Sequence, residues 1–399
     1  MSAILRAVAA DHHIHALGKT VRDLMKANAG LLIVGIATFV LMGAGQSLYG
    51  PALPAFSRAF GVTIGTAGLL VSAHWVGCAM GVAGMFFQGR HVTPRHVVIL
   101  MGLGAALIAT GLGWWTTVLG AVVFGCGYGC STVVFNPAML RAFGARGPAM
   151  LSLLNATFGV GAIGAPLVFV ALSNDPALTF ALCAGLAAVI ALGAGTAWKS
   201  KAVVADNVPT TFNLHLPILG FGMMAIGLEA ILIGLGPAAL IAAGETEVHA
   251  AQLLSAFFLA FLASRVLLIF IAHRLPAFTL YLIALTGTCI AALGAAMIEP
   301  GIFFVIMGAF AGVFFPGFYV TASGKMGLHP RVAPTIIAAG LIGGICAPLM
   351  LSPWLDQLGE RGFFLVIATV TAAIALTALA NLRRMNAKPV ARSILTGAE

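Results

Sequence analysis

Two charged residues stand inside long apolar runs, and their positions most need a chemical explanation. Glu229, in the stretch from Gly227 to Leu240, is the only acid within such a run, and Arg265 is the one base in the next. An ionised side chain at a bilayer centre costs roughly 2.5–3.5 kcal/mol. We therefore expect Glu229 to bind a proton or orient a substrate, and Arg265 to face the protein interior. A role as paired or neutral helix glue is the alternative for Glu229.

Other polar side chains in apolar runs could complete a site. His74 is the second titratable candidate, because its reference pKa of about 6.5 is close to physiological pH. A neutral histidine hydrogen-bonded between helices is an equal alternative. The uncharged and aromatic candidates for substrate binding are Gln46, Tyr49, Trp75, Asn136, Asn155 and Tyr319. Donors, acceptors and ring faces of this kind suit hydroxyl or amide groups better than a strongly anionic substrate.

Composition shows which elements position these residues. The chain has 399 residues, of which 61% are hydrophobic and 8% charged, against about 25% charged in soluble domains. Twelve apolar runs, each about long enough to cross a bilayer, occupy residues 29–50, 64–87, 97–115, 117–140, 148–172, 177–198, 215–243, 248–272, 276–298, 301–323, 332–353 and 362–381. The sequence predicts an all-α membrane protein with twelve transmembrane helices.

The runs divide into two blocks of six. We expect an N-terminal tail over 1–27, six-helix bundles over 28–198 and 215–382, a linker over 199–214 and a C-terminal tail over 383–399. Gly161–Leu167 (GAIGAPL) in the fifth run is echoed by Gly343–Leu349 (GGICAPL) in the eleventh. Matching places in both halves indicate a duplicated transporter with two pseudo-symmetric bundles.

Charge predicts the orientation. If the N-terminus is cytoplasmic, 17 of the 20 Lys and Arg residues fall on the cytoplasmic side, and only Arg58 and Arg361 fall opposite. The positive-inside rule then places both termini and the linker in the cytoplasm. We expect the chain to cross the inner (plasma) membrane of the cell. Net charge of +9 thus reports loop orientation, not a nucleic-acid partner.

Several functions are excluded by what the sequence lacks. It has no HExxH, no P-loop and no Cys/His grouping of ligand number, and its six cysteines form no CxxC. A solvated turn explains the string Asp11–His15 better than a metal site. We expect no enzyme activity, metal or cofactor, and a monomer whose partners are the lipid bilayer, protons and a small-molecule substrate.

Several segments resemble the fucose:proton symporter family of the major facilitator superfamily. They are GPALPAFSRAF from Gly50, LLVSAHWVG from Leu69, GYGCSTVVFNPAM from Gly127, SLLNATFGVGAIGAPL from Ser152, GLEAILIG from Gly227 and FLASR. The resemblance implies the two-bundle fold and alternating access. It departs at Gly50 and Thr132, which take the places of the family's acids in helices one and four, and at Ala156 or Asn155, where the family has His. Fucose itself is therefore not the expected substrate.

Together these features predict a secondary active transporter of a small sugar-like or polyol-like solute, coupled to protons. Proton-driven efflux of amphipathic or drug-like compounds is the alternative. Whether Glu229 and Arg265 form a direct ion pair stays open, because Arg265 lies about 10 Å nearer the cytoplasmic face by helical rise.

Overall fold

The computed structural model describes residues 25–88, 92–197, 212–271, 274–327, 329 and 331–387. The string Asp11–His15, Arg90 and most of the predicted linker and tails lie outside these residues. Within them the chain forms twelve long apolar helices and short 3-10 turns. The predicted all-α membrane fold is confirmed.

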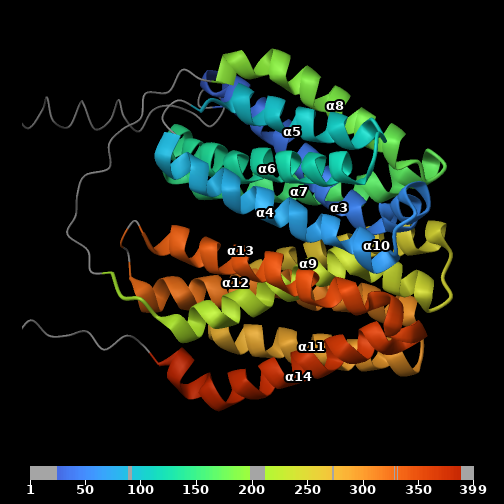
Figure 1. The fold of residues 1–399 in the computed structure, drawn as a ribbon. Helices are drawn as coiled ribbons and strands as arrows, with labels where there is room; N and C mark the ends of the chain where they lie inside the picture. Colours follow the sequence, from blue (N-terminus) through green and yellow to red (C-terminus); the bar gives the residue numbers. More distant parts are fainter. Residues whose placement is uncertain are drawn as a thin grey trace, which may run out of the picture.

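The first six long helices form one bundle (Figure 1). They are α3 (Ala29–Phe60), α4 (Ile64–Gln88), α5 (Pro94–Ala109), α6 (Trp114–Phe143), α7 (Gly147–Ala171) and α8 (Pro176–Gly193). The last six form the other bundle and are α9 (Leu216–Ala242), α10 (Glu247–Ile271), α11 (Ala277–Met297), α12 (Pro300–Met326), α13 (Val332–Leu351) and α14 (Gly359–Asn386). The 3-10 turn η4 (Ser352–Gln357) joins α13 to α14.

Eleven of these helices are long and apolar enough to span a membrane, whereas α5 is shorter. The sequence predicted a third run to residue 115, but α5 ends at Ala109. Gly111 and Gly113 follow with φ of 61° and 155°. Because these angles are incompatible with a right-handed helix, the two glycines form a turn here. The six residues after Ala109 therefore belong to the turn and to the start of α6.

The two bundles repeat the same helix pairings. In the first, α3 packs on α7, α4 on α6, and α5 on both α6 and α8. In the second, α9 packs on α13, α10 on α12, and α11 on both α12 and α14. Each pair in one bundle corresponds to the pair six helices later. This correspondence is what a duplicated six-helix unit produces.

The echoed sequences lie at equivalent contacts. A Cβ at Gly161 of α7 would be 2.0 Å from the carbonyl oxygen of Val40 on α3. A Cβ at Gly343 of α13 would be 1.8 Å from the carbonyl oxygen of Met223 on α9. No larger residue fits at either place, and small residues are what permit such close approach of membrane helices. The two echoes are therefore the same packing device used once in each bundle.

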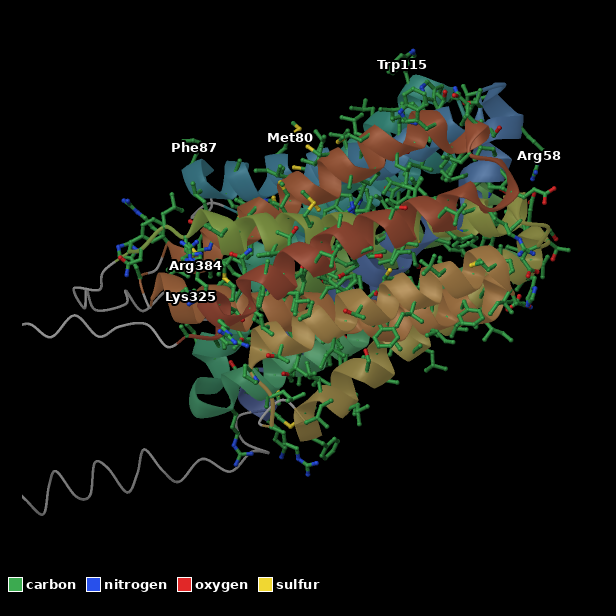
Figure 2. All side chains as sticks on the ribbon, turned by 90° about the horizontal axis from the view of Figure 1, so that it is seen from below. Arg58, Met80, Phe87, Trp115, Lys325 and Arg384 are labelled. Atoms are coloured by element: carbon green, nitrogen blue, oxygen red, sulfur yellow. The ribbon has the colours of Figure 1, made fainter. Side chains whose placement is uncertain are left out.

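The start of α3 and the end of α14 lie at one end of the molecule, which we call the tail end (Figure 1). Asn28 Nδ2 donates to the carbonyl oxygen of Ala142 at 3.4 Å, and Asn213 N donates to that of Met326 at 3.2 Å. Lys325 and Arg384 lie together there, whereas Arg58 lies at the opposite, far end (Figure 2). Exposed apolar side chains such as Met80, Phe87 and Trp115 cover the outside between the ends, where lipid would contact them.

The charge asymmetry gives a testable topology. Reporter fusions at either terminus or within residues 199–211 should report the cytoplasmic side, because the tail end carries the basic residues. A fusion in the far-end connection at Gly244 should report the other side. Fusions that place the 199–211 segment opposite the termini would contradict an even number of helices in the first bundle.

Candidate transport site

Glu229 lies near the middle of α9, on the part of the molecule where the two bundles meet. The side chain as a whole is partly buried, but Oε2 is inaccessible and has no hydrogen-bond partner among the described residues. A buried polar atom without a partner costs about 1–3 kcal/mol. Such a group in a native structure needs an explanation, and a bound solute or proton is one.

Arg265 of α10 is held by its own bundle. Its Nε donates to the carbonyl oxygen of Gly312 at 3.1 Å, and its guanidinium carbon lies 4.3 Å from the ring centre of Phe261. These contacts use one of the five guanidinium N–H groups and one face of the plane. The remaining donors have no hydrogen-bond partner among the described residues, so they can bind an acceptor.

Glu229 and Arg265 form no ion pair in the described structure, so the question left open by the sequence is answered for this state. Each charge nevertheless acts on the other through space, and both act on Tyr128. Tyr128 Oη donates to Gln46 Oε1 at 2.9 Å. Gln46 of α3 and Tyr128 of α6 thus extend the polar group of Glu229 and Arg265 from the second bundle into the first. We call these four residues the polar layer.

His74 of α4 lies inside the first bundle. Its ring centre lies 5.3 Å from that of Tyr49, 5.2 Å from that of Tyr128 and 5.9 Å from that of Phe124. Its Nε2 is 4.0 Å from Cys78 Sγ, and Nδ1 has no partner among the described residues. Enclosure by rings favours the interpretation of His74 as a helix-packing residue that supports Tyr128.

The remaining predicted residues differ in their exposure and in their contacts. Trp75 is partly exposed and packs across the bundle interface on Gly344 of α13, with a Cβ at Gly344 only 2.9 Å from the indole. Tyr319 stacks on Phe315 at 5.1 Å between ring centres. Asn136 has a buried, unpartnered Oδ1, whereas Asn155 is exposed and donates to its own helix at Leu151 O.

Most of the unpartnered buried polar atoms belong to predicted site residues. Six buried side-chain oxygen or nitrogen atoms in the described part of the chain have no hydrogen-bond partner. Four of them belong to residues that the sequence had singled out, namely Tyr49, His74, Asn136 and Glu229. The unsatisfied polar groups thus coincide with the candidate residues.

Tyr128 was not among the residues predicted from sequence. It lies four residues before Thr132, which occupies the place of a family acid, and residues four apart share a helix face. That spacing could have selected it. Gly312 and Phe261, which hold Arg265, carry no signal in the sequence pattern.

The bundles are joined at the far end. Arg58 of α3 forms a bidentate ion pair with Glu247 of α10, with Nη2 and Oε2 3.0 Å apart. Asp356 Oδ2 accepts from the backbone N of Gly65, at the start of α4, at 2.8 Å. An anion at a helix N-terminus is favoured by the unpaired N–H groups there. Farther along α4 from this end, Ser72 Oγ donates to the carbonyl oxygen of Ile345 on α13 at 3.1 Å.

Close backbone packing reinforces this closure. A Cβ at Gly50 of α3 would lie 2.7 Å from the carbonyl oxygen of Ile233 and 2.9 Å from Pro237 Cγ, both on α9. A carboxylate at position 50, as in the resembled family, has no room in this arrangement. The ribbons of the two bundles meet at this end and spread toward the tail end (Figure 1). The polar layer is therefore blocked from the far end.

Comparison with known proteins shows the family to which the chain belongs. The sequence model of the Major Facilitator Superfamily matches residues 35–333, which is most of the chain. The chain belongs to the Major Facilitator Superfamily. It is a transporter and not an enzyme. No curated protein matches the chain by sequence.

Solved structures show the same fold. The nucleoside transporter NupG is 14% identical, with a TM-score of 0.69 over 89% of this chain and 99% of that one. The D-xylose-proton symporter is 14% identical, with a TM-score of 0.67 over 88% and 96%. The E. coli fucose:proton symporter FucP, in its outward conformation, is 18% identical, with a TM-score of 0.59 over 90% and 99%. The resemblance predicted from sequence is confirmed at the level of the superfamily and of FucP's fold.

Proposed function

We propose that this superfamily member is a proton-coupled transporter of a small, hydroxyl-bearing solute, which binds in the layer of Gln46, Tyr128, Glu229 and Arg265. The observation that carries the proposal is the buried Oε2 of Glu229, which has no partner among the described residues, in the same layer as an Arg265 that is not paired with it. A permanent structural pair would be closed into a salt bridge. Because the two side chains are not paired, Glu229 can bind a proton and Arg265 can bind a ligand.

The uncharged members of the layer define the chemistry of the solute. Tyr128 and Gln46 already bond to each other, so they present their remaining lone pairs and the amide N–H groups to a ligand. Trp75 adds a partly exposed ring face next to Tyr128, with ring centres 6.4 Å apart. Hydroxyl groups exploit such donors and acceptors, while the apolar face of a sugar or nucleoside ring packs on the indole.

The substrates of structurally similar transporters support the same class of solute. NupG is a nucleoside transporter, and the other two are a D-xylose-proton symporter and a fucose:proton symporter. These substrates share a hydroxylated ring. This supports a hydroxylated solute for the present chain, and the identity of that solute is left to experiment.

Alternating access supplies the mechanism. Contacts between Arg58 and Glu247 and between Asp356 and the start of α4 close the far end. These contacts join different bundles, so rocking one bundle against the other would break them and open the layer to the far side. Protonation of Glu229 would then be one step of the cycle, with the solute bound from one side and released on the other.

The proposal is tested with purified protein in liposomes. Thermal-shift screening against pentoses, hexoses, polyols and nucleosides should give one or more stabilising ligands, and a pH gradient that is acidic outside should drive uptake of that ligand. A protonophore should abolish accumulation. If only amphipathic drug-like compounds stabilise the protein, and a pH gradient drives them out, the efflux alternative would replace the uptake proposal.

A further inference from the structure

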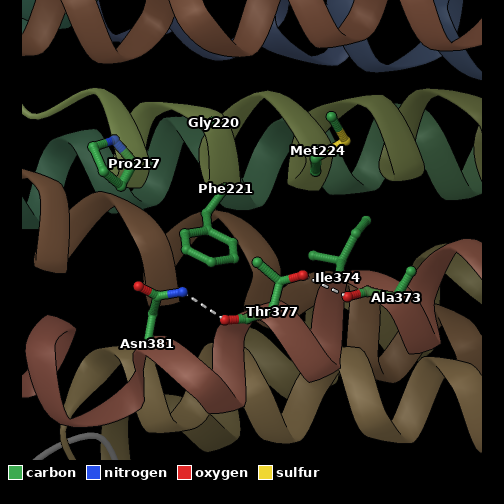
Figure 3. Close-up of a pocket in the computed structure, with 8 residues that line it drawn as sticks. All are labelled: Pro217, Gly220, Phe221, Met224, Ala373, Ile374, Thr377 and Asn381. Atoms are coloured by element: carbon green, nitrogen blue, oxygen red, sulfur yellow. Dashed lines mark hydrogen bonds between the residues drawn. The ribbon is translucent and has the colours of Figure 1, made fainter.

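A groove on the outside of the second bundle lies apart from the transport site. It lies between α9, from Pro217 to Met224, and α14, from Ala373 to Asn381, and has a volume of about 370 Å³ (Figure 3). Its walls extend about 10–12 Å along the two helices by helical rise, which is less than half of a 30 Å hydrocarbon core. The groove therefore lies within one leaflet, the one at the tail end.

The walls of the groove are apolar. Phe221 points from α9 toward α14 and forms its floor with Ile374 (Figure 3). The two polar side chains bond to their own helix, because Thr377 Oγ1 donates to Ala373 O at 2.8 Å and Asn381 donates one of its two Nδ2 hydrogens to Thr377 O at 2.9 Å. The groove thus offers hydrocarbon contact and few free donors, which suits an acyl chain.

The outer rim of the groove faces the membrane. Met224 is 41% exposed, and the neighbouring leucines Leu216, Leu376 and Leu379 are 68%, 67% and 56% exposed. A Cβ at Gly220 would meet no heavy atom within 4 Å. The space beside Gly220 is therefore open to the lipid phase and is not filled by a neighbouring helix.

Positive charge gathers where the groove ends. Arg384 follows one turn after Asn381 on α14, and His215 precedes Pro217 by two residues. Lys325 of α12 donates its Nζ to the carbonyl oxygens of Arg384 at 2.9 Å and Ala387 at 3.1 Å, which fixes it at the same place (Figure 2). We call Lys325 and Arg384 the cationic cluster, and His215 lies beside it.

No acid balances the cationic cluster in the part of the chain that the structure describes. Every described Asp and Glu except Glu229 lies at the far end. Partial burial, together with the charges of Lys325 and Arg384, holds the pKa of His215 below its ordinary value. A lowered pKa favours neutral His215, so Lys325 and Arg384 carry the positive charge, next to an apolar groove and with no described acid beside them.

We propose that the α9–α14 groove binds one acyl chain of an anionic phospholipid, whose phosphate lies at the cationic cluster. Basic groups beside membrane helices attract anionic lipids with about 1 kcal/mol per Lys or Arg near the surface. The groove adds apolar contact along the chain. The bound lipid would join α14, the outermost helix, to α9, the helix that carries Glu229.

The test measures lipid retention by native mass spectrometry of the purified full-length protein, in micelles with equimolar phosphatidylglycerol and phosphatidylcholine. The wild type should retain phosphatidylglycerol in preference. Arg384→Gln should lower that preference about fivefold, which is about 1 kcal/mol. Arg141→Gln removes an exposed arginine at the tail end of the other bundle and should leave the preference unchanged.

Two variants fill the groove from opposite walls. Gly220→Phe and Thr377→Phe should each abolish preferential retention, because the ring occupies the space of the acyl chain. Gly185→Phe on α8 is the matched control, since a Cβ there also meets no heavy atom within 4 Å. Thermal unfolding confirms that each variant is folded. Equal retention of the two lipids by the wild type, or unchanged retention in both groove-filling variants, would overturn the proposal.

Discussion

Glu229→Gln should still exchange substrate across a vesicle membrane but should fail to accumulate it against a gradient. Glutamine keeps the length and hydrogen-bonding reach of the side chain, so the solute site keeps its shape. It cannot gain and lose a proton, so the coupling step is removed. We expect counterflow within about threefold of wild type and pH-driven accumulation reduced to the level without a gradient, measured with the ligand found by thermal shift.

The control for this variant is Glu360→Gln, which makes the same chemical change on an exposed residue at the far end. It should accumulate substrate normally. Accumulation by Glu229→Gln at the wild-type rate would exclude Glu229 as the coupling group, and His74 would then be the next candidate. Loss of both exchange and accumulation would instead assign Glu229 to substrate binding, and ligand-induced thermal stabilisation would then be lost as well.

The sequence singled out Glu229 and Arg265 as candidates because charged residues within membrane-spanning segments are rare. It also predicted the two-bundle fold, since apolar runs of membrane-spanning length leave few alternatives. It could not decide whether the two charges pair. That depends on helix tilt and side-chain direction, and in the structure the Gly312 carbonyl and the Phe261 ring hold Arg265 away from a salt bridge.

Other features depend on contacts that leave no periodic signal. The closed far end is produced by Asp356, in the short turn η4, meeting the start of α4, a residue pair 291 positions apart. Tyr128 enters the polar layer through one hydrogen bond to Gln46. Neither contact changes hydropathy or spacing. The repeat of Gly161 at Gly343 was visible in the sequence because the same close approach of two backbones requires glycine in both bundles.

Arg265→Ala should lower transport on the order of 100-fold while leaving most of the protein folded. The free guanidinium donors can make charge-assisted hydrogen bonds to the solute, each worth roughly 1.5–3 kcal/mol, and alanine removes them all. The Gly312 carbonyl oxygen loses its donor as well, which should lower the unfolding temperature modestly. Arg274→Ala, an exposed arginine beyond the end of α10, is the control and should transport normally.

Arg265→Lys separates charge from geometry. Lysine retains the positive charge but not the planar fork that can bond to Gly312 and to a ligand at once, so we expect partial rescue, about tenfold above Arg265→Ala. Ligand affinity, measured by thermal shift or calorimetry on purified variants, should follow the same order as transport. If Arg265→Ala instead yields little folded protein, and the fraction that folds binds and transports normally, the role of Arg265 is structural. Binding that is weakened in parallel with transport, in protein that unfolds near the wild-type temperature, would assign its free donors to the solute.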